Sequence, residues 1–250
     1  MRIRPAKSFA ELVDFPKSLG PVPPGATEAH GTTVLALRFD KGILNLGDRR
    51  ATSANFIMYD KAEKILSLDD STMVAISGSF ARSVEIVRYL SHAFKYYART
   101  QLQDMSLEGK LQEVSRALSG NLSMTMEGIG IFVPVVSAYD EVSKKFGIYF
   151  YDAMGARFES GAFAAAGSGS ERIRGVFDYI TRSKGPFDTR PLEDVLKDGM
   201  QMLDIAAQLD SATGGLEHVP PLAKTLTAEG IRRVEDEVLA SAIHSVTKAG

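Results

Sequence analysis

The order of strand-type and helix-type segments is the feature that most constrains the fold of this chain of 250 residues. Runs of β-branched and apolar residues come first, and two amphipathic helices follow. Further strand-type runs, two more helices, one strand and a last helix complete the chain. A parallel sheet requires strands and helices to alternate, whereas runs of strands followed by runs of helices favour stacked antiparallel sheets covered by helices. We therefore expect an α+β fold.

The expected elements are bounded by turn residues and by changes in the apolar period. Residues 32–39 are β-branched and apolar, and a polar turn leads from them into a second strand at 42–47. Apolar residues at helical spacing predict a helix over 79–99, and Ser106 is expected to cap the next helix. The other expected elements are strands at 65–68, 73–77, 129–138, 146–152 and 158–166, helices through 173–180 and 192–206, a strand at 222–227 and a helix through 231–238.

The composition excludes several classes of protein. Lys plus Arg number 29 and Asp plus Glu number 31, so the formal net charge of −2 lacks the basic excess of a nucleic-acid-binding protein. No apolar run approaches the roughly 18 residues of a membrane helix, because the longest, 128–138, is interrupted by Pro134. The absence of cysteine excludes a disulfide scaffold, a thiol nucleophile and a thiolate metal site. It also fits the reducing cytoplasm, where we expect the protein to act.

The histidines do not indicate a metal centre. None of the four lies in an HExxH pair or in a cluster of other metal ligands, and a zinc site requires three or four ligands. They are His30, His92, His218 and His244. We therefore expect neither a metal nor an organic cofactor.

The first thirty-one residues differ in character from the rest of the chain. Residues 1–7 are basic, but no apolar stretch follows them, which argues against a secretory signal. The segment 20–25, Gly-Pro-Val-Pro-Pro-Gly, fits neither a helix nor a central strand. On composition alone this part of the chain has the character of a frayed N-terminal tail.

A glycine-rich turn at 167–170, Gly-Ser-Gly-Ser, lies between an expected strand and an expected helix. Backbone N–H groups at the start of a helix bind anions, so a phosphate site is one interpretation. The turn lacks the GxxxxGK[ST] pattern and a following lysine, which weakens that interpretation. A tight turn with a helix cap is the simpler one.

Six motifs taken together resemble the proteasome β-subunit family, and most closely the bacterial, actinobacterial-type subunits. In chain order they are His30-Gly-Thr-Thr-Val-Leu-Ala-Leu37, Gly47-Asp-Arg-Arg-Ala-Thr52, Lys64, Ser77-Gly78, Gly167-Ser-Gly-Ser170 and Asp210-Ser-Ala-Thr-Gly-Gly215. The resemblance implies an N-terminal nucleophile hydrolase fold, a four-layer αββα sandwich of two antiparallel sheets flanked by helices. The expected order of strands and helices agrees with that fold.

The resemblance also implies how such a chain becomes an enzyme. Residues 1–31 would be a propeptide removed by self-cleavage between Gly31 and Thr32, leaving 32–250 as a single catalytic domain. Thr32 would then carry both the nucleophilic hydroxyl and a free α-amine. An α-amine has a pKa of about 7.7–8.0, so it can take the hydroxyl proton near neutral pH. In the uncut chain the same nitrogen is an amide and has no such basicity.

The same resemblance assigns supporting residues. Lys64 would place positive charge beside the Thr32 hydroxyl, Asp48 would pair with Lys64, and the Gly78 N–H would donate to the oxyanion, a contribution worth ~10²–10³ in rate. Further support falls on Ser168, Asp210 and Thr213; many relatives have serine at the last position, but the hydroxyl is retained. The predicted substrate-binding positions are Ala51, Thr52, Ala62, Leu66, Ile76, Phe80 and Val84. Six of these side chains are apolar and line the expected specificity pocket, which predicts cleavage after apolar residues.

Partners follow from the resemblance as well. It implies homo-heptameric β rings that stack on rings of α subunits, an ATPase unfoldase ring acting through the α ring, and unfolded proteins as substrates. Three alternatives remain open: a non-catalytic β-type ring subunit, a subunit of the related hexameric ATP-dependent bacterial protease, and an unrelated enzyme that binds phosphate at 167–170.

Overall fold

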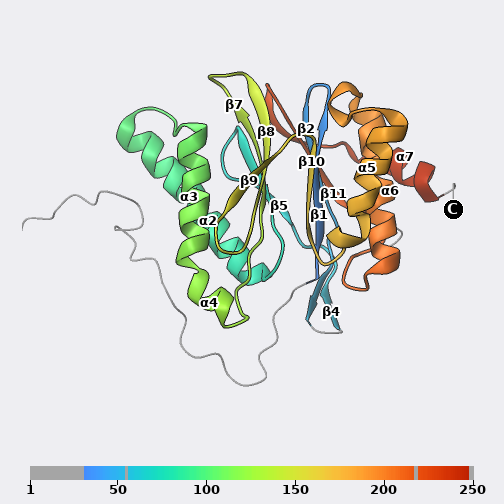
Figure 1. The fold of residues 1–250 in the computed structure, drawn as a ribbon, viewed down its shortest axis with the longest axis horizontal. Coiled ribbons are helices and arrows are strands. Elements are labelled where there is room, and N and C mark those ends of the chain that lie inside the picture. The colour runs from blue at the N-terminus through green and yellow to red at the C-terminus, as the bar shows by residue number, and fades with distance from the viewer. Residues whose placement is uncertain (1–30, 54–55, 217–218, 248–250) are drawn as a thin grey trace, which may run out of the picture.

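The fold has four layers, with two sheets face to face between two layers of helices (Figure 1). The computed structural model describes residues 31–53, 56–216 and 219–247. In those ranges each of the two large sheets has five antiparallel strands. The expected αββα sandwich is confirmed. Among the described residues, none of the helices combines the length and the apolar character needed to cross a membrane.

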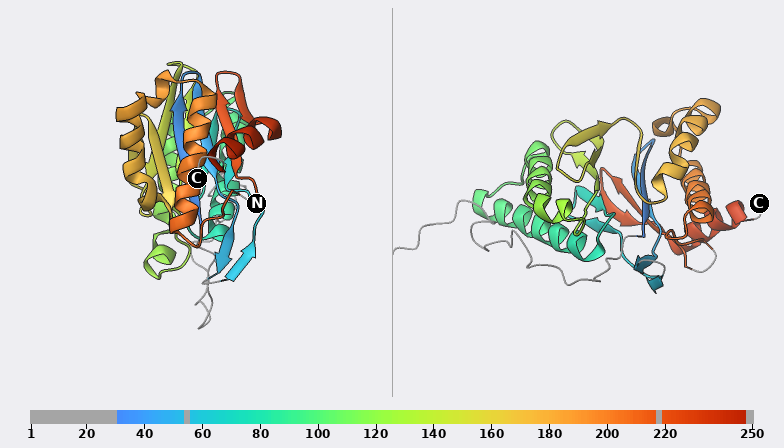
Figure 2. Two further views of the ribbon diagram at one scale, coloured as in Figure 1. Left: turned by 90° about the vertical axis from the view of Figure 1, so that its right-hand side faces the viewer. Right: turned by 60° about the horizontal axis from the view of Figure 1, so that its bottom comes forward.

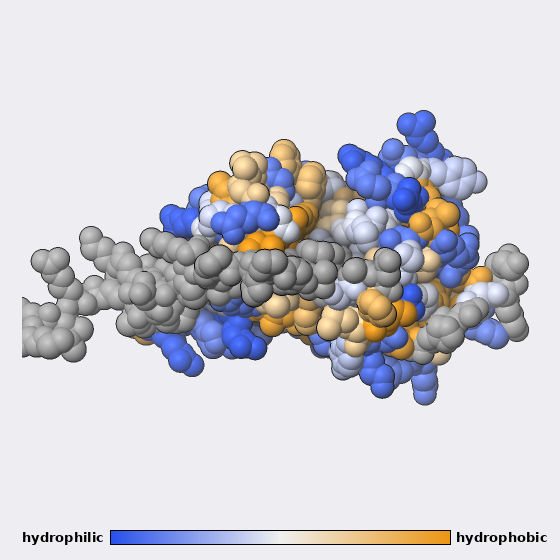
Figure 3. All heavy atoms as spheres, turned by 90° about the horizontal axis from the view of Figure 1, so that it is seen from below, coloured by the Kyte–Doolittle hydropathy of each residue, from blue (hydrophilic) through white to orange (hydrophobic). Residues whose placement is uncertain are grey.

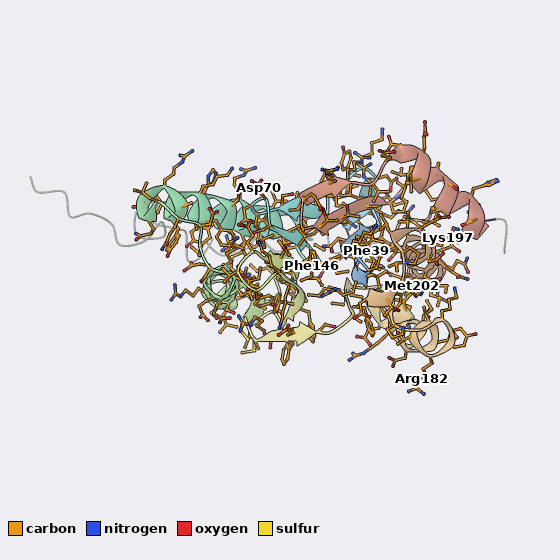
Figure 4. The ribbon with its side chains drawn as sticks, turned by 90° about the horizontal axis from the view of Figure 1, so that it is seen from above. Phe39, Asp70, Phe146, Arg182, Lys197 and Met202 are labelled. Atoms are coloured by element: carbon orange, nitrogen blue, oxygen red, sulfur yellow. The ribbon has the colours of Figure 1, made fainter. Side chains whose placement is uncertain are left out.

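The first sheet has the strand order β10-β1-β2-β11-β12. Its strands are β10 (Phe163–Gly167), β1 (Thr33–Phe39), β2 (Gly42–Gly47), β11 (Leu222–Thr227) and β12 (Gly230–Arg233). Its outer face is covered by α5 (Ser170–Lys184), α6 (Leu192–Leu209) and α7 (Asp236–Thr247), with a short 3-10 helix at Phe187–Thr189. Because side chains alternate along a strand, Leu35 and Leu37 of β1 pack towards α6, where they meet Met200 and Leu203. In Figure 4, Phe39 and Met202 lie inside this half while Arg182 points outwards.

The second sheet has the order β5-β6-β7-β8-β9. Its strands are β5 (Ile65–Ser67), β6 (Thr72–Ala75), β7 (Val135–Asp140), β8 (Lys145–Tyr151) and β9 (Arg157–Ser160), and its outer face is covered by α2 (Phe80–Gln101) and α3 (Leu107–Gly120), which α4 (Leu122–Met126) follows. Ser106 accepts a hydrogen bond from the N–H of Gly109, so the predicted cap is confirmed. Between the sheets, Val34 packs in one apolar layer with Met73 and Ile148.

Three of the expected elements are wrong in detail. The expected strand at 158–166 is two strands in different sheets, because the chain crosses from β9 to β10 near Gly161. The strand at 129–138 begins only after Pro134, which has no N–H to give to a sheet. The helix through 231–238 is strand β12 followed by α7, since Gly230 (φ +103°) closes a hairpin with β11 before the helix starts.

A separate two-stranded hairpin was not expected from the sequence. It consists of β3 (Ala51–Ser53) and β4 (Phe56–Tyr59), with Thr52 opposite Ile57. The hairpin projects from one end of the sandwich, at the bottom of Figure 1 and in both views of Figure 2. The hairpin follows the end of β2, and the candidate site described below lies at this same end of the sandwich.

Candidate active site

The antiparallel order of the first sheet brings the predicted site to one end of the sandwich. Thr33 is opposite Gly167 and Val34 is opposite Gly47, so the start of β1 lies beside the ends of β2 and β10. Asp48 follows β2 and Ser168 follows β10. From the second sheet, the residue before β5 is Lys64, which reaches across to this cluster through its side chain.

Asp48 and Lys64 form a buried ion pair, with 2.8 Å between Asp48 Oδ1 and Lys64 Nζ and each side chain 1% exposed. The backbone N–H of Thr33 donates to the same Oδ1 at 2.7 Å. The N–H groups of Arg50 and Gly214 donate to Oδ2, both at 2.9 Å. Asp48 therefore has four donors in the interior, which is how a buried charge is stabilised.

The ammonium group of Lys64 has two further acceptors. It donates to the carbonyl oxygen of Gly31 at 3.1 Å and to that of Arg50 at 2.5 Å. Burial lowers the pKa of Lys64 below its usual 10.5, and the carboxylate of Asp48 opposes that effect. The result is a fixed cation aimed at the carbonyl group of Gly31.

The junction between Gly31 and Thr32 lies directly against this cation. The Thr32 hydroxyl donates to the Gly31 carbonyl oxygen at 2.5 Å, and Thr32 is buried. A Cβ added to Gly31 would collide with Thr52 Oγ1 and lie 2.7 Å from the Ala212 carbonyl oxygen. Only glycine fits this close approach, so the structure explains the residue type on the N-terminal side of the junction.

Asp210, at the C-terminal end of α6, accepts hydrogen bonds from two of the predicted supporting hydroxyls. Ser168 and Thr213 each donate to Oδ2 at 2.6 Å, and Ser168 also lies 3.3 Å from the carbonyl oxygen of Thr32. Partial burial raises the pKa of Asp210, but the hydrogen bonds from Ser168, Thr213 and the Ala212 N–H outweigh it and leave the pKa below its usual value. Asp210 is therefore held as a carboxylate.

Thr33 is a site residue that the sequence reasoning missed. Because Thr213 donates to Asp210, the hydroxyl of Thr33 donates to Thr213, at 2.6 Å. Gly169 permits this contact, since a Cβ there would collide with Thr33 Oγ1. The second threonine of the Thr32-Thr33 pair was the available signal, but a threonine at the start of a strand is unremarkable by itself.

The substitution Thr33→Val is expected to weaken this chain of hydroxyls. It keeps the shape of the side chain and leaves Thr213 without a donor, so we expect a loss of about 1–2 kcal/mol in the free energy of unfolding. We also expect slower removal of residues 1–31, the predicted propeptide, which is called the leader below. Thr33→Ser should restore both. Denaturant unfolding and a time course of intact mass measure the two effects, and unchanged values for Thr33→Val would exclude a role for the hydroxyl.

Gly78, the predicted oxyanion donor, lies in an isolated bridge with Phe132. The two hydrogen bonds of that bridge are made by neighbours, from Ser79 N–H to the Ile131 oxygen at 2.7 Å and from Val133 N–H to the Ser77 oxygen at 3.1 Å. The N–H of Gly78 is thus outside the pairing. Gly78 has φ +96°, which favours glycine. Within the described ranges no hydrogen bond joins it to Thr32, so its role stays a prediction.

The predicted substrate-binding residues fall into two groups. Four of them, Leu66, Ile76, Phe80 and Val84, belong to the apolar cluster between the second sheet and α2. Ala51 and Thr52 lie on β3, and the N–H of Ala62 donates to the Arg49 carbonyl oxygen at 2.9 Å. The two groups are linked through Lys64, whose carbonyl oxygen accepts from the N–H of Ile76 at 2.8 Å.

The turn at 167–170 is engaged by the fold. Gly167 has φ +102°, and a Cβ there would collide with the Thr32 carbonyl oxygen. The Ser170 hydroxyl donates to the Gly167 carbonyl oxygen at 2.7 Å. This geometry favours a tight turn over a phosphate site, but the N-cap residue of α5 is Gly169, which makes no side-chain cap hydrogen bond, so the expected helix cap is not found.

Comparison with known proteins agrees with this arrangement. The family model described as proteasome subunit matches residues 28–216. "Proteasome subunit beta" of Streptomyces griseus is 34% identical over 231 residues, which is 91% of this chain and 80% of that protein. "Proteasome subunit beta 2" of Thermomonospora curvata is 34% identical over 88% of this chain and 78% of its own length. "Proteasome subunit beta" of Acidothermus cellulolyticus is 32% identical over 88% and 76%.

Proposed function

The chain belongs to the proteasome subunit family, and we propose that it is a catalytic β subunit, a threonine endopeptidase whose nucleophile is Thr32. One observation carries the proposal: the buried Lys64–Asp48 pair touches the Gly31 carbonyl group, to which the Thr32 hydroxyl also donates. A ring subunit without catalytic function does not need a buried cation at that position. Burying the Lys64 ammonium costs free energy that its partners must compensate, so its presence at this position argues for a catalytic role.

The first reaction is removal of residues 1–31. The Thr32 hydroxyl oxygen attacks the carbonyl carbon of Gly31 and loses its proton, and the Lys64 ammonium stabilises the charge that develops on the carbonyl oxygen. The bond from that carbon to the Thr32 nitrogen breaks, and the nitrogen takes up a proton to become the free amine. Water then hydrolyses the ester that remains and releases Gly31 as a carboxylate.

The second reaction is cleavage of other peptides. The free amine of Thr32 takes the hydroxyl proton as the oxygen attacks, and Lys64 lowers the energy of the resulting alkoxide. The Gly78 N–H donates to the oxyanion of the tetrahedral intermediate. The peptide C–N bond then breaks, the leaving amine takes the proton held by the Thr32 amine, and water hydrolyses the ester to release the acyl part as a carboxylate and restore the Thr32 hydroxyl. Ser168, Asp210 and Thr213 hold the amine in place.

The family assembles as rings with α subunits, and we extend that assembly to this chain. Homo-heptameric β rings would enclose the sites, and an ATPase ring acting through the α ring would deliver unfolded proteins in the cytoplasm.

Intact mass of the chain purified with its α partner tests the proposal. A chain that begins at Thr32 and hydrolyses peptides is the expected result. Assembled particles that retain residues 1–31 and hydrolyse nothing would make the chain a non-catalytic ring subunit instead.

Cleavage preference gives a second measurement. Because the predicted pocket is lined by Ala51, Ala62, Leu66, Ile76, Phe80 and Val84, we expect kcat/KM to be at least about tenfold higher after Leu, Phe or Tyr than after Arg or Asp, since burying a large apolar side chain is worth about 1.5–3 kcal/mol. A panel of peptides differing only at that position measures the ratio. Faster cleavage after Arg or Asp would contradict the assignment of the pocket.

The pH profile of peptide hydrolysis is expected to be bell-shaped. Activity rises as the Thr32 amine loses its proton, near its ordinary pKa of about 7.7–8.0. It falls again at alkaline pH as Lys64 loses its charge, below the usual 10.5 because burial lowers that pKa. Rates of hydrolysis measured from about pH 6 to about pH 11 test both the acidic rise and the alkaline fall of the profile. Activity that keeps rising beyond pH 10.5 would exclude an essential charge on Lys64.

A further inference from the structure

Strand β4 presents an exposed apolar surface beside the candidate site. Its four consecutive residues, Phe56, Ile57, Met58 and Tyr59, are 77%, 53%, 66% and 57% exposed. In the described part of the chain, no other exposed large apolar residues are consecutive, although Phe150 and Phe158 stack on each other across β8 and β9. Figure 3 looks onto the end of the molecule from which the hairpin projects, and apolar side chains are exposed there. Because β4 pairs only with β3 among the residues that the structure describes, its outer edge is open to them as well.

Residues 1–30 of the leader are joined to the described chain next to this surface. It continues from Gly31, which lies against Thr52 of β3, and Thr52 is opposite Ile57 of β4. Fifteen residues, 16–30, separate the junction from the apolar part of the leader. They span at most about 50 Å when extended, so the apolar part can reach the hairpin of its own chain.

The leader contains a pattern suited to an apolar surface. Ser8 and Glu11 have the spacing of a capping box, and Phe9, Leu12 and Val13 recur at the spacing of one helix face before Pro16. The segment 8–15 thus has the sequence of a short amphipathic helix that ends at the proline.

We propose that segment 8–15 of the leader docks its apolar face, Phe9, Leu12 and Val13, on the exposed surface of β4 in the uncut chain. Four residues are few for a separate partner, since a stable interface uses about 20–30 residues on each side. A tethered segment needs less, because its effective concentration is about millimolar. The leader covers the hairpin until cleavage releases it. The inference does not depend on the cleavage mechanism, because it concerns a chain in which the leader is still attached.

The absence of cysteine makes this docking directly measurable. In full-length chains that carry Thr32→Ala and whose intact mass shows that the leader is still attached, Val13→Cys is combined with Met58→Cys. The matched control combines Val13→Cys with Val142→Cys; Val142 is 93% exposed and lies between β7 and β8, at the opposite end of the sandwich from the hairpin. Disulfide formation under mild oxidation is followed by intact mass at several protein concentrations.

The expected result is an intrachain disulfide that forms at least tenfold faster for the Met58 pair than for the Val142 pair, at a rate independent of protein concentration. Adding Phe9→Ser and Leu12→Ser should reduce the faster rate to that of the control. Equal rates for the two pairs would overturn the proposal. So would disulfides between chains at a rate that rises with concentration, because a second copy would then be the occupant of the hairpin.

Discussion

A chain carrying Thr32→Ala is expected to keep residues 1–31 and to lose peptide hydrolysis by a factor on the order of 10⁶, the size of effect that removal of a nucleophile produces. Alanine removes the oxygen that attacks in both reactions, so neither the ester nor the free amine can form. The fold should persist, because the Thr32 hydroxyl donates only to the adjacent Gly31 carbonyl group among the described residues. Intact mass, peptide hydrolysis and thermal unfolding give the three readouts.

Thr32→Ser is the matched control. Serine keeps the oxygen 2.5 Å from the Gly31 carbonyl oxygen and removes only a methyl group, so leader removal and hydrolysis should continue at reduced rates. A Thr32→Ala chain that still lost its leader in the purified, assembled particle would show that another group or another protein cuts the junction.

The resemblance of six motifs to a known family indicated the site, whereas the chemistry of the individual residues would not have done so. Asp48 and Lys64 each look like ordinary charged residues at the ends of strands, and it was the combination of six motifs that connected them to Thr32. The contacts that stabilise Asp48 could not be predicted from the sequence, because they are made by backbone N–H groups of Arg50 and Gly214, which do not depend on the residue type. They meet Asp48 only through tertiary folding.

The fold was predictable where apolar periodicity was strong. The buried strands β1 and β2 and the helix α2 are confirmed close to their expected bounds. Period alone failed where the chain changes sheet, as between β9 and β10, because only Gly161 and Ala162 separate the two strands. It also missed β4, whose four residues are all apolar and therefore show no alternation, although all four are exposed.

The second large effect is expected for Lys64→Met. Methionine has a similar length but no charge, so the developing negative charge on the Gly31 carbonyl oxygen and on the Thr32 oxygen loses the cation that stabilises it. We expect leader removal and peptide hydrolysis to fall by about 10³ or more, in line with the loss of a preorganised electrostatic group. Lys64→Arg should not restore activity, because a planar guanidinium does not fit a site where the lysine side chain is 1% exposed.

Stability separates this catalytic effect from a structural one. Breaking a buried ion pair typically costs about 3–5 kcal/mol, and Asp48 keeps the N–H groups of Thr33, Arg50 and Gly214, so we expect Lys64→Met to fold with a loss near the lower end of that range. Lys110 offers a matched control, since its largely buried ammonium pairs with Asp69 at 2.8 Å in the other half of the sandwich. Lys110→Met should lower the unfolding temperature while cleavage continues. If both variants lost cleavage in proportion to stability, Lys64 would be a structural residue only; if Lys64→Met alone abolishes cleavage, its charge acts on the reacting atoms.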